Sequence, residues 1–229
     1  MTARGAPQQV TIDDGAGEKV SGLWLRPAKA RACLVLAHGA GAGMMHTSMI
    51  ALADGLAARE VATLRYQFPY MERGSRRPDR PAVAHQVVRA ACARAAKLAG
   101  ELPLFAGGKS FGGRMTSQAQ AAAPLPGVCG LVFFAFPLHP AGEPSVSRAD
   151  HLAKVEVPML FLQGTRDALA GLELLEPVVG ALGRRAQLIL APDADHAFHV
   201  PVKSGRKDKD VLAALLEDAS AWMIGTQRT

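Results

Sequence analysis

Apolar residues along the chain alternate between short continuous runs and longer amphipathic stretches. A run predicts a buried strand, because a strand covered on both faces is apolar at every position. A stretch with apolar residues three or four positions apart predicts a helix that buries one face. The predicted strands are residues 8–13, 19–25, 32–37, 61–66, 102–107, 127–136, 159–163 and 186–190. The predicted helices are residues 47–59, 81–98, 111–122, 171–182 and 210–223.

The order of these elements predicts the fold class. Strands that alternate with long helices pair in parallel and carry helices on both faces of the sheet. We therefore predict an α/β three-layer sandwich with a mostly parallel sheet of about eight strands. Ligands of such sheets bind beyond the carboxyl ends of the strands, so chemistry is expected in the loops that follow them.

Length and composition indicate one globular domain over residues 1–229. Hydrophobic residues make up 49% of the chain and charged residues 20%, and no repeat or low-complexity linker interrupts it. The longest apolar stretch has 11 residues, too few to cross a bilayer, and the first residues show no secretory signal. Cys33, Cys92 and Cys129 lie in apolar contexts without metal-ligand spacing. We expect a cytoplasmic protein that binds neither membrane nor metal.

The charge balance is basic, with 26 Lys and Arg against 20 Asp and Glu and a net charge of +6. Nucleic-acid readers combine such charge with aromatic stacking partners. Here the basic residues lie in two loop clusters that interleave with acidic residues, so we expect solvated surfaces and no nucleic-acid partner. The alternative is a field that steers an anionic substrate. The clusters are Arg73, Arg76, Arg77 and Arg80, and Lys203, Arg206, Lys207 and Lys209.

A G-x-S-x-G motif follows the fifth predicted strand and leads into a helix. It reads Gly108-Lys109-Ser110-Phe111-Gly112. A serine on a sharp strand-to-helix turn has a strained backbone, and the flanking glycines keep Cβ atoms away from the crossing chains. A phosphate-binding loop is the alternative, but it requires an earlier glycine where this chain has Pro103. We therefore interpret Ser110 as a nucleophile.

A serine nucleophile needs a base within hydrogen-bond reach, and the base needs an orienting carboxylate. The loop after the seventh predicted strand carries Asp167, and the loop after the eighth carries His196. The chain order of serine, acid and histidine is that of hydrolases built on such an elbow. His199 is an alternative base, and Asp193 or Asp195 an alternative acid. His196 is favoured because it lies nearer the end of its strand.

Acyl transfer also needs two N–H donors that face the oxyanion of the tetrahedral intermediate. We expect one from Phe111, next to the nucleophile. The other is expected from Ala40, in the glycine-rich loop 38–43 that follows the third predicted strand. A dinucleotide-binding turn is the alternative for this loop, but the glycines are spaced G-x-G-x-G and no acidic residue ends the next strand.

These motifs give the chain a family resemblance over about residues 20–223. It resembles the α/β-hydrolase superfamily, and within it the small hydrolases without a lid that are related to dienelactone hydrolase. The stretches that carry the resemblance are LAHGAGAGM (36–44), FPYME (68–72), AGGKSFGGRM (106–115), FPLHPAGEP (136–144), VPMLFLQGTRD (157–167) and DHAFHVP (195–201). The resemblance implies that Ser110, Asp167 and His196 occupy the catalytic positions, with Ala40 and Phe111 at the oxyanion. Dienelactone hydrolases have a cysteine where this chain has Ser110, so general ester hydrolysis is expected rather than that substrate.

Several side chains are candidates to shape the substrate pocket. Only about 20 residues separate the sixth and seventh predicted strands, too few for a lid domain, so we predict an open site. Tyr66 and Tyr70 follow a strand end and are candidate substrate contacts, with Lys109 as a third. The alternative is that the tyrosines pack their loop against the body. His139 and Arg148, in the short connection, face either the cleft or solvent.

The sequence thus predicts a serine hydrolase that cleaves an ester-like bond of a small-molecule acyl substrate through an acyl-enzyme, without a cofactor. Two alternatives stay open. One is a binding or scaffold protein on the same fold. The other is a thioesterase or peptidase with the same machinery. The oligomeric state is not predicted.

Overall fold

The strands of the protein form one sheet with an antiparallel edge. A computed structural model describes residues 5–15 and 17–226, so the ends of the predicted domain 1–229 fall outside the described residues. The strands are β1 (Gln8–Asp13), β2 (Lys19–Leu25), β3 (Ala32–Ala37), β4 (Val61–Tyr66), β5 (Leu104–Lys109), β6 (Val128–Phe134), β7 (Met159–Gly164) and β8 (Ala186–Ala191). Their order is β1-β2-β4-β3-β5-β6-β7-β8. β2 is antiparallel to β1 and β4, and the other pairs are parallel, which confirms the predicted fold class.

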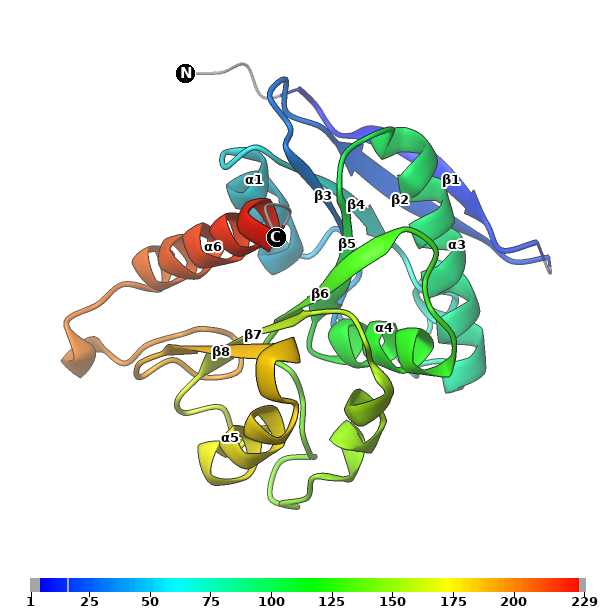
Figure 1. Ribbon diagram of the computed structural model, residues 1–229. Helices are drawn as coiled ribbons and strands as arrows, with labels where there is room; N and C mark the ends of the chain where they lie inside the picture. Colours follow the sequence, from blue (N-terminus) through cyan, green and yellow to red (C-terminus); the bar gives the residue numbers. More distant parts are fainter. Residues whose placement is uncertain (1–4, 16, 227–229) are drawn as a thin grey trace.

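Helices cover both faces of this sheet. The α-helices are α1 (Thr47–Ala57), α2 (Pro69–Glu72), α3 (Pro81–Ala99), α4 (Phe111–Ala122), α5 (Leu172–Ala181) and α6 (Asp208–Gly225). Short 3-10 helices are η1 (Ser147–Lys154), η2 (Gly183–Arg185) and η3 (Val202–Ser204). α1 and α6 lie on one side of the sheet, and α3, α4 and α5 lie on the other (Figure 1). In the part of the chain that the structure describes, none of these helices is both long and apolar enough to cross a bilayer.

The sheet separates two hydrophobic cores, because successive side chains of a strand point to opposite faces. In β3, Cys33 and Val35 join the core formed with α3, α4 and α5. Leu34 and Leu36 of the same strand join the core formed with α1 and α6. Each of the four side chains is at most 2% exposed. A central strand that serves two cores must be apolar throughout, which is the pattern seen in the sequence.

Two of the short helices that the hydrophobic pattern does not predict lie near the site. α2 begins at Pro69, whose fixed φ suits the first turn of a helix. η1 lies in the proline-containing connection between β6 and β7, where no helix or strand was predicted. Both are too short to show a hydrophobic period, because a period is recognisable only over several turns. Both flank the carboxyl ends of the strands.

The chain segments approach each other closely at the turn from β5 to α4. A Cβ atom on Gly112 would lie 2.6 Å from the carbonyl carbon and oxygen of Ala37, at the end of β3. A Cβ atom on Gly108 would also collide with the Ala37 carbonyl. Backbone atoms in a sheet cannot move aside, so only glycine permits this crossing. The turn is therefore pressed against the end of the central strand.

Replacing Gly112 by alanine should lower the free energy of unfolding by about 1–3 kcal/mol, because the new methyl group overlaps backbone atoms. Gly180→Ala is the matched control: its Cβ atom would meet nothing within 4 Å, on the exposed side of α5. That substitution should be neutral or stabilising by up to about 1 kcal/mol. Urea unfolding of the three proteins measures both effects. Equal stability of Gly112→Ala and the wild type would contradict the packing argument.

Candidate active site

Ser110 sits at the turn between β5 and α4 in a strained backbone conformation. Its φ is 50° and its ψ is −119°, in a region that residues other than glycine rarely adopt. Its N–H donates a hydrogen bond of 3.0 Å to the carbonyl of Phe134, which ends β6. The turn is thereby tied to the neighbouring strand. The serine hydroxyl is presented at the carboxyl edge of the sheet.

A continuous hydrogen-bonded chain links Ser110 to His196 and Asp167. Ser110 Oγ lies 2.8 Å from His196 Nε2, and His196 Nδ1 lies 2.7 Å from Asp167 Oδ2. A carboxylate only accepts, so the imidazole proton is on Nδ1 and Nε2 is free to accept from the serine hydroxyl. The Asp167 side chain is fully buried, whereas the His196 side chain is 26% exposed. The three residues of this hydrogen-bonded chain come from three separate loops.

The Asp167 carboxylate is held by two further donors. The side-chain amide of Gln163 donates to Oδ2, and the backbone N–H of Leu169 donates to Oδ1 at 2.8 Å. Gln163 itself is fully buried at the end of β7. Sequence reasoning missed its role, although a polar residue that closes an otherwise apolar strand was a visible signal. The carboxylate is thus oriented toward His196 from both of its oxygens.

The alternative acids and base lie elsewhere. Asp195 Oδ1 accepts from the backbone N–H groups of Ala197 and His199, so this carboxylate shapes the loop. The Nδ1 atom of His199 lies 2.8 Å from Asp208, in an exposed pair at the start of α6. Asp193 is exposed. The structure brings none of them into a hydrogen bond with Ser110 or His196 in its described residues.

A cleft opens beside Ser110, and Ala40 and Phe111 line it as well. Its volume is about 380 Å³. Among the described residues, no protein acceptor is recorded for the backbone N–H of Ala40 or of Phe111, the first residue of α4. Two backbone N–H groups without a protein acceptor therefore belong to residues that line the cleft beside Ser110. Met115, Arg114, Arg148 and Leu169 also line the cleft.

The alpha/beta hydrolase domain family matches residues 30–224. The chain belongs to this family. The fold of the hydrolase is similar to dienelactone hydrolase from Anabaena variabilis, with 21% identity, 96% of this chain and 99% of that chain covered, and a TM-score of 0.77. A serine hydrolase without a lid from Xanthomonas campestris has 20% identity, coverages of 97% and 98%, and a TM-score of 0.72. Est1E from Butyrivibrio proteoclasticus has 16% identity, coverages of 96% and 100%, and a TM-score of 0.74.

The two tyrosines proposed as substrate contacts are buried. Tyr66 is fully buried in the hydrophobic core at the end of β4. Tyr70 is 1% exposed, and its hydroxyl accepts a hydrogen bond of 3.4 Å from the N–H of Gly41. Neither lines the cleft beside Ser110. The structure therefore favours the alternative interpretation, in which the two rings pack the loop against the body of the protein. Burial of the large apolar rings stabilises the fold by more than exposure of their hydroxyl groups to water would.

In the connection between β6 and β7, Arg148 lines the cleft beside Ser110, whereas His139 does not. His139 is 5% exposed and structural: its Nε2 accepts from the N–H of Gly171, and its Nδ1 donates to the carbonyl of Pro140. Arg148, at the start of η1, lines the cleft. One candidate of this loop thus reaches the cleft and the other does not.

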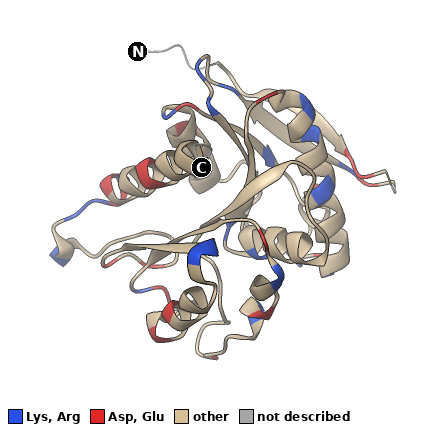
Figure 2. Ribbon diagram, viewed as in Figure 1, with Lys and Arg blue, Asp and Glu red and all other residues tan. Residues whose placement is uncertain are grey.

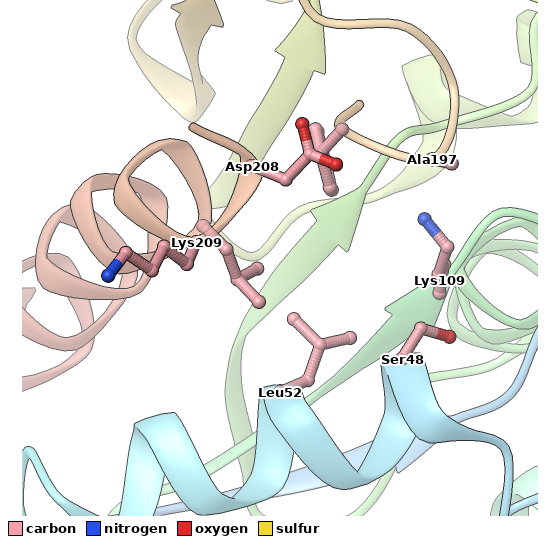
Figure 3. Close-up of a pocket in the computed structure, with 8 residues that line it drawn as sticks. Ser48, Leu52, Lys109, Ala197, Asp208 and Lys209 are labelled. Carbon is pink, nitrogen blue, oxygen red and sulfur yellow. The ribbon is translucent and has the colours of Figure 1, made fainter. Parts of the chain in front are cut away.

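Lys109 reaches the backbone of the histidine loop rather than the cleft. Its Nζ donates to the carbonyl of His196 at 3.0 Å and lies 4.8 Å from the centre of the Phe198 ring. It borders a separate cavity of about 130 Å³, shown in Figure 3 with Ser48 and Leu52 of α1 opposite. Burial lowers the pKa of Lys109 to about 8, although Asp167 and Asp195 oppose the shift. The lysine therefore fixes the loop that carries His196.

His38 joins the Ala40 loop to the loop after β4. Its Nε2 accepts a hydrogen bond of 3.0 Å from the N–H of Phe68, so the proton is on Nδ1, which donates to the carbonyl of Gly39 at 2.8 Å. The ring is completely buried. Burial lowers the pKa of His38 from 6.5 to about 4, although the bond to Gly39 opposes the shift. The neutral ring thus holds the proposed oxyanion loop in place.

Acid should destabilise the hydrolase through His38. The unfolded imidazole takes up a proton below pH 6.5, but the folded one does so only near pH 4, so the unfolded state binds more protons between these values. The free energy of unfolding should fall by up to about 3 kcal/mol from this group as the pH drops through that window. His38→Asn should be less stable at pH 7 but show a shallower fall, measured by denaturant titration at each pH. An identical pH dependence in both proteins would contradict this account.

Proposed function

We propose that the protein is a serine hydrolase that cleaves an ester-like acyl bond through an acyl-enzyme. The observation that carries the proposal is the hydrogen-bonded chain from Ser110 through His196 to Asp167. Ser110 Oγ attacks the carbonyl carbon while His196 Nε2 takes the hydroxyl proton. Asp167 stabilises the resulting imidazolium and keeps its ring in position. The tetrahedral oxyanion accepts hydrogen bonds from the N–H groups of Ala40 and Phe111.

The second half of the reaction uses the same groups. His196 gives its proton to the leaving alcohol, and the carbon–oxygen bond to that alcohol breaks. A water molecule then attacks the acyl-enzyme while His196 Nε2 takes a proton from it. The acid is released when Ser110 Oγ recovers that proton. No step needs a cofactor, because the chain itself supplies the nucleophile, the base and the oxyanion donors.

Relatives and burial support the class of substrate and the compartment. Solved structures of the same fold include a dienelactone hydrolase and an esterase domain, and ferulic acid is bound to Est1E. We therefore propose a small-molecule acyl ester as substrate. We also propose a cytoplasmic location, because Cys33 and Cys92 are buried thiols that form no disulfide. Two neighbouring thiols of this kind suit a reducing compartment.

A fluorophosphonate probe should label the wild-type protein at Ser110, and Ser110→Ala should not be labelled. Asp167→Asn should lower kcat on an acyl ester by about 10³- to 10⁴-fold, because the imidazole loses its orienting acceptor. His199→Ala is the matched control and should retain activity, since its imidazole pairs with Asp208. Mass spectrometry locates the label. Steady-state kinetics on esters, thioesters and amides measures kcat of each variant and shows which type of bond is cleaved. Folded wild-type protein that is neither labelled nor active would instead be a binding or scaffold protein.

Lys109→Met should lower kcat by about 10- to 100-fold and leave KM within about twofold. The reason is that Nζ holds the His196 carbonyl rather than the substrate. Lys109→Arg retains a donor and should recover part of the rate. Steady-state kinetics on a short-chain ester measures kcat and KM separately. A rise in KM with unchanged kcat would show that Lys109 binds substrate instead.

A further inference from the structure

Two guanidinium groups line the cleft that contains Ser110. Arg114 belongs to α4, one turn after the nucleophile, and its N–H donates to the Ser110 carbonyl at 3.1 Å. Arg148 comes from η1, in the connection between β6 and β7. Two elements far apart in the sequence thus bring positive charge to the same small volume. Neither positive charge would stabilise the binding of a neutral acyl chain.

Neither guanidinium has a carboxylate partner among the described residues. Asp79 also borders the cleft, but it is already engaged: Oδ2 accepts from the N–H of Tyr70 at 2.8 Å, and Oδ1 pairs with Arg73 at 2.5 Å. The Nε atom of Arg114 is buried and has no hydrogen-bond partner. A buried donor without an acceptor is costly, so part of the Arg114 guanidinium is desolvated without compensation.

No acidic side chain among the described residues pairs with Arg114, whose Cζ lies 5.9 Å from the centre of the Phe111 ring. Burial lowers the pKa of Arg114, and the charge of Arg148 lowers it further, so the two groups repel each other. Behind Arg114, His151 Nε2 lies 2.7 Å from the Ser117 hydroxyl, and burial lowers the pKa of His151 to about 4. Asp150 is an acidic neighbour of His151, but among the described residues it forms no ion pair with either arginine. An anion between the arginines would relieve their mutual repulsion.

Charged side chains also occur on the helices that cover the sheet. Lys and Arg recur along α3, whereas Asp and Glu mark α5 and α6 (Figure 2). In the predicted basic cluster after β4, Arg73 is paired with Glu18 and Asp79. The basic excess of the chain is therefore partly balanced at that surface. In the cleft, Arg114 and Arg148 are not balanced by an ion pair with a described residue.

We propose that the hydrolase selects acyl groups that end in an oxyanion, a carboxylate or a phosphate, which Arg114 and Arg148 bind while Ser110 attacks the ester carbonyl. This inference rests on the proposed function. The anion belongs to the acyl part, because His196 must face the leaving alcohol to protonate it and is not among the residues that line this cleft. Ala40 and Phe111, the proposed oxyanion donors, line the same cleft as the two arginines. Planar guanidinium groups bind either oxyanion through paired hydrogen bonds.

The test compares p-nitrophenyl esters that differ only at the end of the acyl chain. The substrates are the monoester of glutarate, the ester of 4-phosphonobutyrate and the neutral ester of 5-methylhexanoate, whose branched end has the shape of a carboxylate. The wild type should favour at least one anionic ester over the neutral one by about 10-fold or more in kcat/KM. The two anionic esters distinguish carboxylate from phosphate as the group recognised. The preference should weaken as salt is added.

Arg114→Met and Arg148→Met should each lower the ratio of anionic to neutral kcat/KM by about 10-fold, mainly through KM of the anionic ester. Arg184→Met, at an exposed arginine of η2, is the matched control and should leave the ratio unchanged. The ratio does not depend on the amount of folded protein, because both esters are hydrolysed by the same sample. If Arg114→Met does not fold, Arg148→Met alone tests the inference. Hydrolysis of the neutral ester at an equal or higher kcat/KM, or variants with an unchanged ratio, would overturn this inference alone. Failure on every ester, without probe labelling, would overturn the proposed function as well.

Discussion

The site depends on one close approach, between the end of β3 and the turn that carries Ser110. Ala37 leaves no room for a Cβ atom at Gly108 or Gly112, so the chain can cross there only with glycine on both sides of the serine. The crossing holds Ser110 at a φ of 50°, a strained conformation that the sheet and α4 jointly impose. Strain of this kind persists because the surrounding packing determines the backbone more strongly than local preference does. The hydroxyl is consequently presented in one direction, toward His196.

Around this crossing, hydrogen bonds from buried polar side chains hold the loops of the site in place. His196 is held through its own carbonyl by Lys109 and through its ring by Asp167. The loop of Ala40 is held by a buried neutral imidazole, His38. Each support lies outside the cleft, so the cleft wall is free to vary without disturbing the reacting atoms. That separation suits a fold in which loops of different lengths host different substrates.

The cleft itself is short and open, because the connection between β6 and β7 contributes only η1 where a lid domain would be inserted. Under the proposed function, specificity comes from a few groups close to Ser110. Arg114, one turn along the helix, is tied to Ser110 by a hydrogen bond from its N–H to the Ser110 carbonyl. Arg148 is carried by the short connection instead, so the same segment that replaces a lid also supplies charge to the cleft.

The sequence by itself determined the sheet and the order of its chemistry. Central strands such as β3 were predictable because two-sided burial demands apolar residues throughout, and Ser110, Asp167 and His196 were assigned because each follows a strand end. Tertiary structure decided which polar groups meet. The near neighbours Asp195 and His199 turn to other partners, Gln163 orients Asp167, and Tyr66 is buried rather than at the cleft. The reason is that a strand pattern fixes where a residue lies along the chain, whereas the direction of a loop side chain depends on contacts with segments distant in sequence.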